Sequence, residues 1–129
     1  MITWQDVKEY LKNNYTVQDE GDGYINIILS YKSYKDGRNQ VVMIKKMISI
    51  DQIWLHILSP IGNIKQDDLD IALEILFKGN CGGLVKDGDT YFVKDTMPIA
   101  HLSIEELVDP IGPCCIISRF DRRKNNRNR

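Results

Sequence analysis

The stretch from Phe77 to Asp89, FKGNCGGLVKDGD, holds the residues of this chain that look most like a catalytic or phosphate-binding loop. Its glycines would let a backbone approach a phosphate, and a thiol such as Cys81 beside free amides can ionise to a nucleophile. Phosphate loops precede a helix, however, whereas here the predicted helix comes first and presents its negative end, which opposes a phosphate and disfavours a thiolate. We therefore interpret the stretch as a joint between a helix and a β-hairpin.

The two histidines and the remaining cysteines also lack the spacing of a known site. His56 and His101 are far apart in sequence, and Cys114 and Cys115 are adjacent. The chain contains none of the C-x₂-C, H-x₃-H or H-E-x-x-H patterns that hold metals. We therefore expect no catalytic residue and no metal site, and keep as an alternative a small enzyme that uses Cys81, Cys114 or Cys115 with one of the histidines.

Three acidic residues, Asp67, Asp68 and Asp70, form a further candidate cluster. They lack the spacing and the glycine pivot of a calcium-binding EF-hand. Carboxylates at this position suit the cap and first turn of a helix, where they complement the helix dipole. We therefore interpret them as structural, and we expect no cofactor.

The elements that position these residues follow from hydrophobic periodicity, which predicts an α+β domain in the order α-β-β-β-α-β-β-α. The domain would contain an antiparallel sheet with helices packed on it. Thr3 is the expected N-cap of the first helix, and Ser103 and Glu106 form a capping box at the start of the last. The predicted elements are residues 3–14, 24–31, 40–48, 53–58, 67–77, 84–86, 90–94 and 103–120, the last divided by Pro110 and Pro113.

Turn residues separate these elements. Acids and glycines predict a turn at residues 19–23, and Asp36-Gly37 and Asp87-Gly88 are pairs that favour tight β-hairpins. A short break is expected at residues 49–52. Proline and glycine predict a loop at residues 59–63.

The second and third predicted strands are apolar on both faces. In residues 40–48, Val42 and Ile44 share one face while Met43 and Met47 share the other. In residues 53–58, both faces of the strand carry apolar side chains. Such strands are central in a sheet or covered on both sides. Met43, Met47 and Trp54 are our candidates for a partner or dimer surface.

Composition sets the class of protein. The chain has 129 residues, 43% of them hydrophobic and 27% charged, as is ordinary for one globular domain. We expect no signal sequence, because no basic region followed by an apolar one opens the sequence, and no membrane span, because no apolar run is long enough. The odd number of cysteines, with no C-x-x-C pair, favours a reducing compartment, so we expect a cytoplasmic protein.

Charge is unevenly distributed along the chain. Residues 1–118 carry 11 basic and 17 acidic side chains, whereas residues 119–129 carry 6 basic and 1 acidic. We therefore predict a single domain over residues 1–120 followed by a basic, disordered tail over residues 121–129. A nucleic-acid-binding role for this tail is a further alternative, disfavoured because the acidic body would repel the same polyanion.

The segment from Asp67 to Val108 resembles the YbjN-like family, whose members share the type III secretion chaperone-like fold. An amphipathic helix ending near an asparagine, a glycine, a D-G-D hairpin and a Ser-capped helix follow one another as in that family. The residues that match are Asn80, Gly83, Asp87, Gly88, Pro98, Leu102, Ser103 and Glu106. The chain departs from the family at residues 109–113, where the family continues a long final helix that contributes to pairing.

The resemblance implies a compact α+β domain, often a homodimer, with no catalytic or cofactor-binding residues to carry over. Chaperones of this fold wrap an extended client segment around their surface. We therefore expect a non-enzymatic protein-binding module, chaperone-like or regulatory, whose partner is a protein client or a second copy of the chain. We expect no membrane, nucleic-acid or small-molecule partner.

Overall fold

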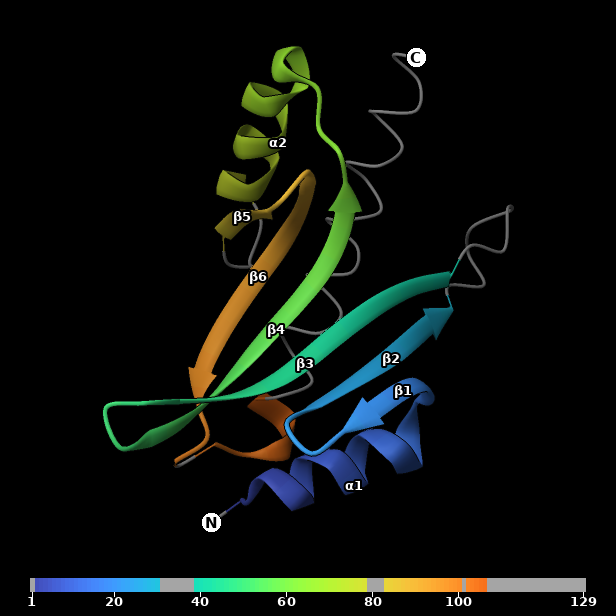
Figure 1. Ribbon diagram of the computed structural model, residues 1–129, viewed down its shortest axis with the longest axis vertical. Helices are drawn as coiled ribbons and strands as arrows, with labels where there is room; N and C mark the ends of the chain where they lie inside the picture. The colour runs from blue at the N-terminus through green and yellow to red at the C-terminus, as the bar shows by residue number, and fades with distance from the viewer. Residues whose placement is uncertain (1, 31–38, 79–82, 101, 107–129) are drawn as a thin grey trace.

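The computed structural model describes residues 2–30, 39–78, 83–100 and 102–106. Its helices and strands follow in the order α1 (Trp4–Asn14), β1 (Thr16–Gly21), β2 (Tyr24–Ser30), β3 (Asn39–Ser49), β4 (Gln52–Gly62), α2 (Gln66–Lys78), β5 (Gly83–Asp87) and β6 (Thr90–Pro98). The strands form one antiparallel sheet in the order β1-β2-β3-β4-β6-β5 (Figure 1). The predicted α+β class and antiparallel sheet are confirmed.

The first helix begins as predicted. Thr3 Oγ1 accepts a hydrogen bond from the Asp6 amide at 3.1 Å, and the Asp6 carboxylate accepts one from the Thr3 amide at 2.9 Å. This reciprocal capping box satisfies donors that the first turn leaves free. The hydrogen bond from the Thr3 amide to the Asp6 carboxylate is the main reason that the Asp6 pKa lies below its ordinary value, and the interaction with the Thr3 hydroxyl is the second.

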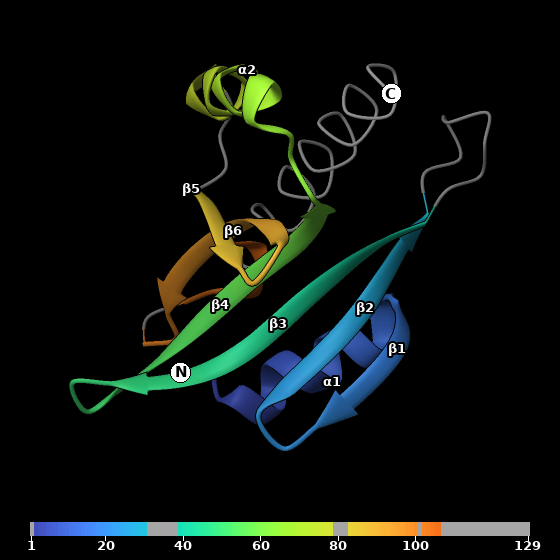
Figure 2. The same cartoon turned by 45° about the horizontal axis from the view of Figure 1, so that its top comes forward.

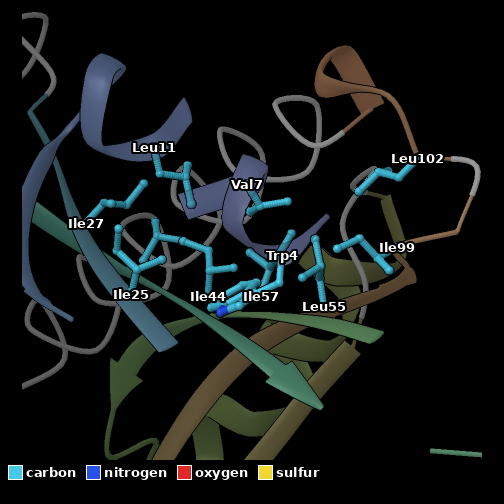
Figure 3. Close-up of a cluster of buried hydrophobic side chains, with 11 residues drawn as sticks. Trp4, Val7, Leu11, Ile25, Ile27, Ile44, Leu55, Ile57, Ile99 and Leu102 are labelled. Atoms are coloured by element: carbon cyan, nitrogen blue, oxygen red, sulfur yellow. The ribbon is translucent and has the colours of Figure 1, made fainter. Parts of the chain in front are cut away.

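The main core lies between α1 and one face of the sheet. Figure 3 shows Trp4, Val7 and Leu11 pointing from the helix toward isoleucines of β2, β3 and β4. Ile99 and Leu102, which follow β6, close one end of the core. The buried members are Trp4, Val7, Leu11, Ile25, Ile27, Val42, Ile44, Leu55, Ile57, Ile99 and Leu102.

The strand β1 was missing from the sequence prediction, which placed a turn at residues 19–23. The turn occupies only residues 22 and 23, because the chain from Thr16 to Gly21 pairs with β2. Only Val17 of this polar edge strand is apolar. Its place is fixed by α1: Lys12 and Lys8 lie 2.9 and 3.6 Å from the Glu20 carboxylate, and the Trp4 indole donates to the Asp22 carbonyl at 2.8 Å.

The loop predicted at residues 59–63 is also wrong, because β4 runs on to Gly62. Proline lacks the N–H that a ladder needs, and the register between β4 and β6 shifts between Pro60 and Gly62. The irregularity accommodates the proline within a strand that is central, as predicted, though neither described helix lies on its second face. The extended end of β4 brings Ile61 into a second core.

The second core joins α2 to the β5-β6 end of the sheet, on the same face as α1. Val93 lies opposite Ser59 and Leu84 in the ladders, so its side chain shares the face of Ile57. Figure 2 shows α1 along the β1-β2 side and α2 near β5. The buried members of this core are Ile61, Ile64, Ala72 and Val93.

The helix α2 turns a different stripe to the sheet than predicted. The expected stripe contained Leu69, Ala72, Leu73, Leu76 and Phe77. Ala72 is buried and Leu69 packs on the second core, but Leu73 and Phe77 are exposed; the side chain of Leu76 lies outside the described part of the structure. The helix begins at Gln66, so Asp67 and Asp68 stand in its first turn, as predicted, and neither is its cap.

The two predicted hairpins with tight turns differ in outcome. Asp87 pairs with Thr90, so the two-residue loop is Gly88-Asp89, one residue later than predicted, with Gly88 at φ +61°. Glycine at the first central position is typical of a type II′ turn. The turn at Asp36-Gly37 lies outside the described residues.

At the C-terminal side, Ser103 Oγ accepts a hydrogen bond from the Glu106 amide at 3.2 Å, as the predicted cap requires. The rest of that helix, its division by Pro110 and Pro113, and the tail at residues 121–129 lie outside the described residues.

A buried polar cluster joins β3 to β4. Gln40 is fully buried, and its amide donates to Ser59 Oγ at 2.8 Å and to the Pro60 carbonyl at 2.9 Å. Ser59 Oγ donates in turn to the Val41 carbonyl at 3.0 Å. The cluster satisfies polar groups beside the irregular end of β4, and it favours one register between the two strands.

We expect Gln40→Met to lower the free energy of unfolding by about 1–3 kcal/mol, because methionine keeps the volume but removes the donor to Ser59 and Pro60. Urea unfolding of the purified protein measures this change. Gln5→Met, on the exposed side of α1, is the control and should change stability by less than about 0.5 kcal/mol. Equal effects of the two substitutions would contradict a structural role for the cluster.

Candidate functional site

The candidate site is the face of the sheet opposite α1 and α2, which we call the open face. Residues alternate between the two faces of a strand, and the core residues fix which face each belongs to. Within the described part of the chain, no helix lies on the open face. Its central side chains are Asn26, Ile28, Val41, Met43, Lys45, Met47, Trp54, His56, Leu58, Phe92, Lys94 and Thr96.

The structure places all three candidate surface residues on the open face. Met47 lies directly opposite Trp54 across the β3-β4 ladder, and Met43 lies opposite Leu58. Side chains opposite one another in an antiparallel pair have Cβ atoms about 4.5–5.5 Å apart. Met43, Trp54 and Leu58 are partly exposed, and Met47 is exposed. The three candidates therefore belong to two apolar pairs on β3 and β4, separated by the pair of Lys45 and His56, and we call these two pairs together the apolar strip.

Exposed isoleucines lie near the tip of the β3-β4 hairpin, which projects beyond the rest of the sheet (Figure 1); Ile48 is on the face of the core rather than on the open face. Ile48 is 72% exposed and Ile50 is 92% exposed. Ile50 and Asp51 have φ of 50° and 58°, the left-handed conformation of a type I′ turn. That conformation favours asparagine and glycine, and it is unfavourable for a β-branched side chain such as that of Ile50. An exposed isoleucine in a strained turn adds nothing to the core.

Three basic side chains occupy the middle of the open face. His56 lies opposite Lys45 on one side and opposite Thr96 on the other, while Lys94 lies one pair along, opposite Leu58. Partial burial lowers the pKa of His56, and the nearby charges of Lys94 and Lys45 lower it further. His56 is therefore mainly the neutral imidazole at pH 7, in a locally positive environment.

The sequence predictions found only part of this surface. They named the methionines and the tryptophan, and they treated His56 as a surface or partly buried histidine. Lys94, Leu58 and Phe92 were missed as members of the face. The predicted break at residues 49–52 is a hairpin with a two-residue loop at Ile50-Asp51, and that loop length would have given the pairing of β3 with β4. The pairing of β4 with β6 has no local signal in the sequence.

The cysteine alternative cannot be placed in the same way. Cys81, Cys114, Cys115 and His101 lie outside the described residues. Within the described residues, no three His, Cys, Asp or Glu side chains gather in a way that could hold a metal ion. In that same part of the chain, no helix combines the length and apolar character needed to cross a membrane.

Comparisons with protein-family models, with curated proteins and with solved structures found no match to this chain. The resemblance to the YbjN-like family therefore remains a prediction made from the residues. The open face must be interpreted from its own chemistry.

Replacing the strained turn should stabilise the fold. We expect the double substitution Ile50→Asn with Asp51→Gly to raise the free energy of unfolding by about 1–2 kcal/mol, because both new residues tolerate positive φ. Urea unfolding measures the gain. Ile48→Asn, on the adjacent strand end with ordinary φ, is the control and should give no gain; a double variant no more stable than the parent would contradict the strain.

The charge environment of His56 gives a pH prediction. NMR titration should place its pKa below the ordinary value of about 6.5. Because the folded-state pKa is lowered, the contribution of His56 to stability is complete above about pH 6.5 and decreases as the pH falls toward the lowered pKa, where the unfolded chain binds the proton first.

Lys94→Gln and Lys45→Gln should each raise the His56 pKa toward its ordinary value, since each removes a positive charge beside the ring. Lys65→Gln, in the connection before α2, is the control and should leave it unchanged. The spectrum of His101→Gln assigns the two histidine signals. An unshifted pKa in both lysine variants would show that the lysines do not face His56.

Proposed function

We propose that this domain is a non-enzymatic protein-binding module that holds a segment of a protein client, in a chaperone-like or regulatory role in the cytoplasm. The client lies on the open face and contacts the strip formed by Met43, Met47 and Trp54. The observation that carries the proposal is this apolar strip on a sheet face that neither described helix covers.

Several properties of the strip suit protein recognition. Methionine side chains are flexible and polarisable, so they adapt to different partner side chains. Tryptophan is enriched at the centres of protein interfaces, where it buries a large area. Exposed apolar side chains grouped on one surface cost solubility, and such groups mark interaction sites in soluble proteins.

The resemblance to type III secretion chaperones is part of this proposal. The described part of the chain is compatible with it, since it contains an antiparallel sheet with helices on one face. Chaperones of that fold bind extended client segments, and the exposed strip along β3 and β4 would suit a ligand of that shape.

The proposal is tested by photo-crosslinking in the cell that naturally makes the protein. A benzophenone amino acid is placed at Met43, at Met47 or at Trp54, and the adducts are identified by mass spectrometry. We expect the same partner protein from all three positions, because they lie on one face. The control position is Glu9, on the exposed side of α1. Absence of a shared adduct, or an identical adduct from Glu9, would contradict the proposal.

A further inference from the structure

The chemistry of the open face limits what its client can be, if the proposed function holds. The face is not uniformly apolar, because Lys45, His56 and Lys94 lie at its centre on three adjacent strands. The other side chains around this basic cluster are neutral. A ligand that covers the apolar strip must also cover two ammonium groups.

Among the residues that the structure describes, neither lysine forms an ion pair. Lys8 and Lys12, by contrast, pair with Glu20 between α1 and β1. The acidic side chains of this face lie on its edge strands: Asp19 of β1 accepts a hydrogen bond from the Tyr24 hydroxyl at 3.2 Å, and Asp87 of β5 lies opposite Thr90. Asp95, next to Lys94 in sequence, points to the opposite face and accepts from the Thr96 amide.

Along β3 and β4, apolar pairs flank Lys45 and His56 on both sides, and Lys94 of β6 lies beside one of these pairs, opposite Leu58. Met47 and Trp54 form a pair toward the hairpin tip, and Met43 and Leu58 form a pair on the other side. An extended segment lying along the strands would therefore meet apolar, basic and again apolar surface. Complementary side chains would be apolar, acidic and apolar.

We infer that the client segment of the open face is an acidic amphipathic stretch of protein, whose carboxylates pair with Lys45 and Lys94 while its apolar side chains cover the Met43, Met47 and Trp54 strip. Burying a lysine without a partner is costly, whereas pairing it with a carboxylate recovers much of that cost. The apolar contacts supply most of the affinity, and the lysines select the partner.

The same observations disfavour two other occupants. Two lysines and a neutral histidine among uncharged side chains offer few contacts to a phosphate backbone, which proteins bind through many cations. A second copy of the chain packed face to face about a twofold axis would place the same basic cluster on both sides of the interface, and like charges repel.

The test uses three short fluorescent peptides in which every second residue reads leucine-glutamate-leucine, leucine-glutamine-leucine or leucine-lysine-leucine, with serine between them. One face of each extended peptide is therefore apolar at both ends and acidic, neutral or basic in the middle. Fluorescence anisotropy measures their binding to the full chain. We expect the glutamate peptide to bind at least about tenfold more tightly than the glutamine peptide, and the lysine peptide to bind most weakly. Added salt should reduce the preference for glutamate, because it screens the lysines.

Substitutions assign the preference to the cluster. In Lys45→Met with Lys94→Met, the side-chain stems remain and the charges are removed, so the glutamate and glutamine peptides should bind about equally. Lys65→Met, away from the face, is the control and should keep the preference. Met47→Ser should weaken both peptides, since it acts on the shared apolar strip. Urea unfolding of each variant confirms that the fold is intact.

The outcomes separate this inference from the proposed function. If both peptides bind equally and Met47→Ser weakens both, the protein-binding role survives and the acidic preference is wrong. If no peptide binds, both are wrong. Tighter binding of oligothymidylate than of the glutamate peptide would assign the face to nucleic acid, and a dimer that Met47→Ser dissociates would assign it to a second copy; either result would overturn the inference.

Discussion

The register between β3 and β4 is the constraint on which the rest of the structure depends. Both strands have eleven residues, and both contribute to the core beneath α1. A shift of one residue would exchange the faces of every side chain, so that the isoleucines of the core would face outward. Two features at opposite ends of the pair hold the register. At one end Gln40 donates to Ser59 and to the Pro60 carbonyl, and at the other end the two-residue turn at Ile50-Asp51 fixes Ser49 opposite Gln52.

That same register creates the open face. Once Ile44 and Ile57 are directed toward α1, alternation directs Met43, Lys45 and Met47 of β3 to the other side. An antiparallel sheet can leave one face to solvent, but that face is then usually polar. Here it is mixed, since apolar pairs stand on both sides of a basic cluster. The fold does not require this composition, because polar residues at these positions would maintain the same strands and the same core. The departure from the usual pattern is what makes the face a candidate for function.

The sequence predicted those elements whose signals are local. The Thr3 cap, the burial of Val7 and Leu11 and the hairpin near Gly88 depend on neighbouring residues, and the structure confirms them. The errors occurred where distant contacts decide. The strand β1 is polar, and it forms because β2 offers an edge while Lys8 and Lys12 hold Glu20. Pro60 indicated a loop, but Gln40, twenty residues earlier, supplies a donor to its carbonyl. The orientation of α2 is set by its contacts with the second core and not by the apolar periodicity of its sequence. Leu73 and Phe77 are therefore exposed. For the candidate site, Met43, Met47 and Trp54 could be named from surplus apolar character, whereas Lys94 required the pairing of β4 with β6.

In the proposed interface, the basic cluster and the apolar strip would contribute in different ways to the binding free energy. Removal of apolar area from water has no direction, so Met47 and Trp54 alone would accept many partners. Charges contribute less to the total affinity of an interface, but they discriminate strongly, because a partner without carboxylates leaves Lys45 and Lys94 desolvated and unpaired. His56 lies between the two lysines and is mainly neutral, so it adds no third positive charge to repel them. When a carboxylate arrives beside the ring, the charged imidazolium becomes more favourable, so the same cluster can add a proton as it gains a partner. A mixed face therefore combines adaptable contact with selection by charge, and neither the apolar strip nor the lysines could provide both.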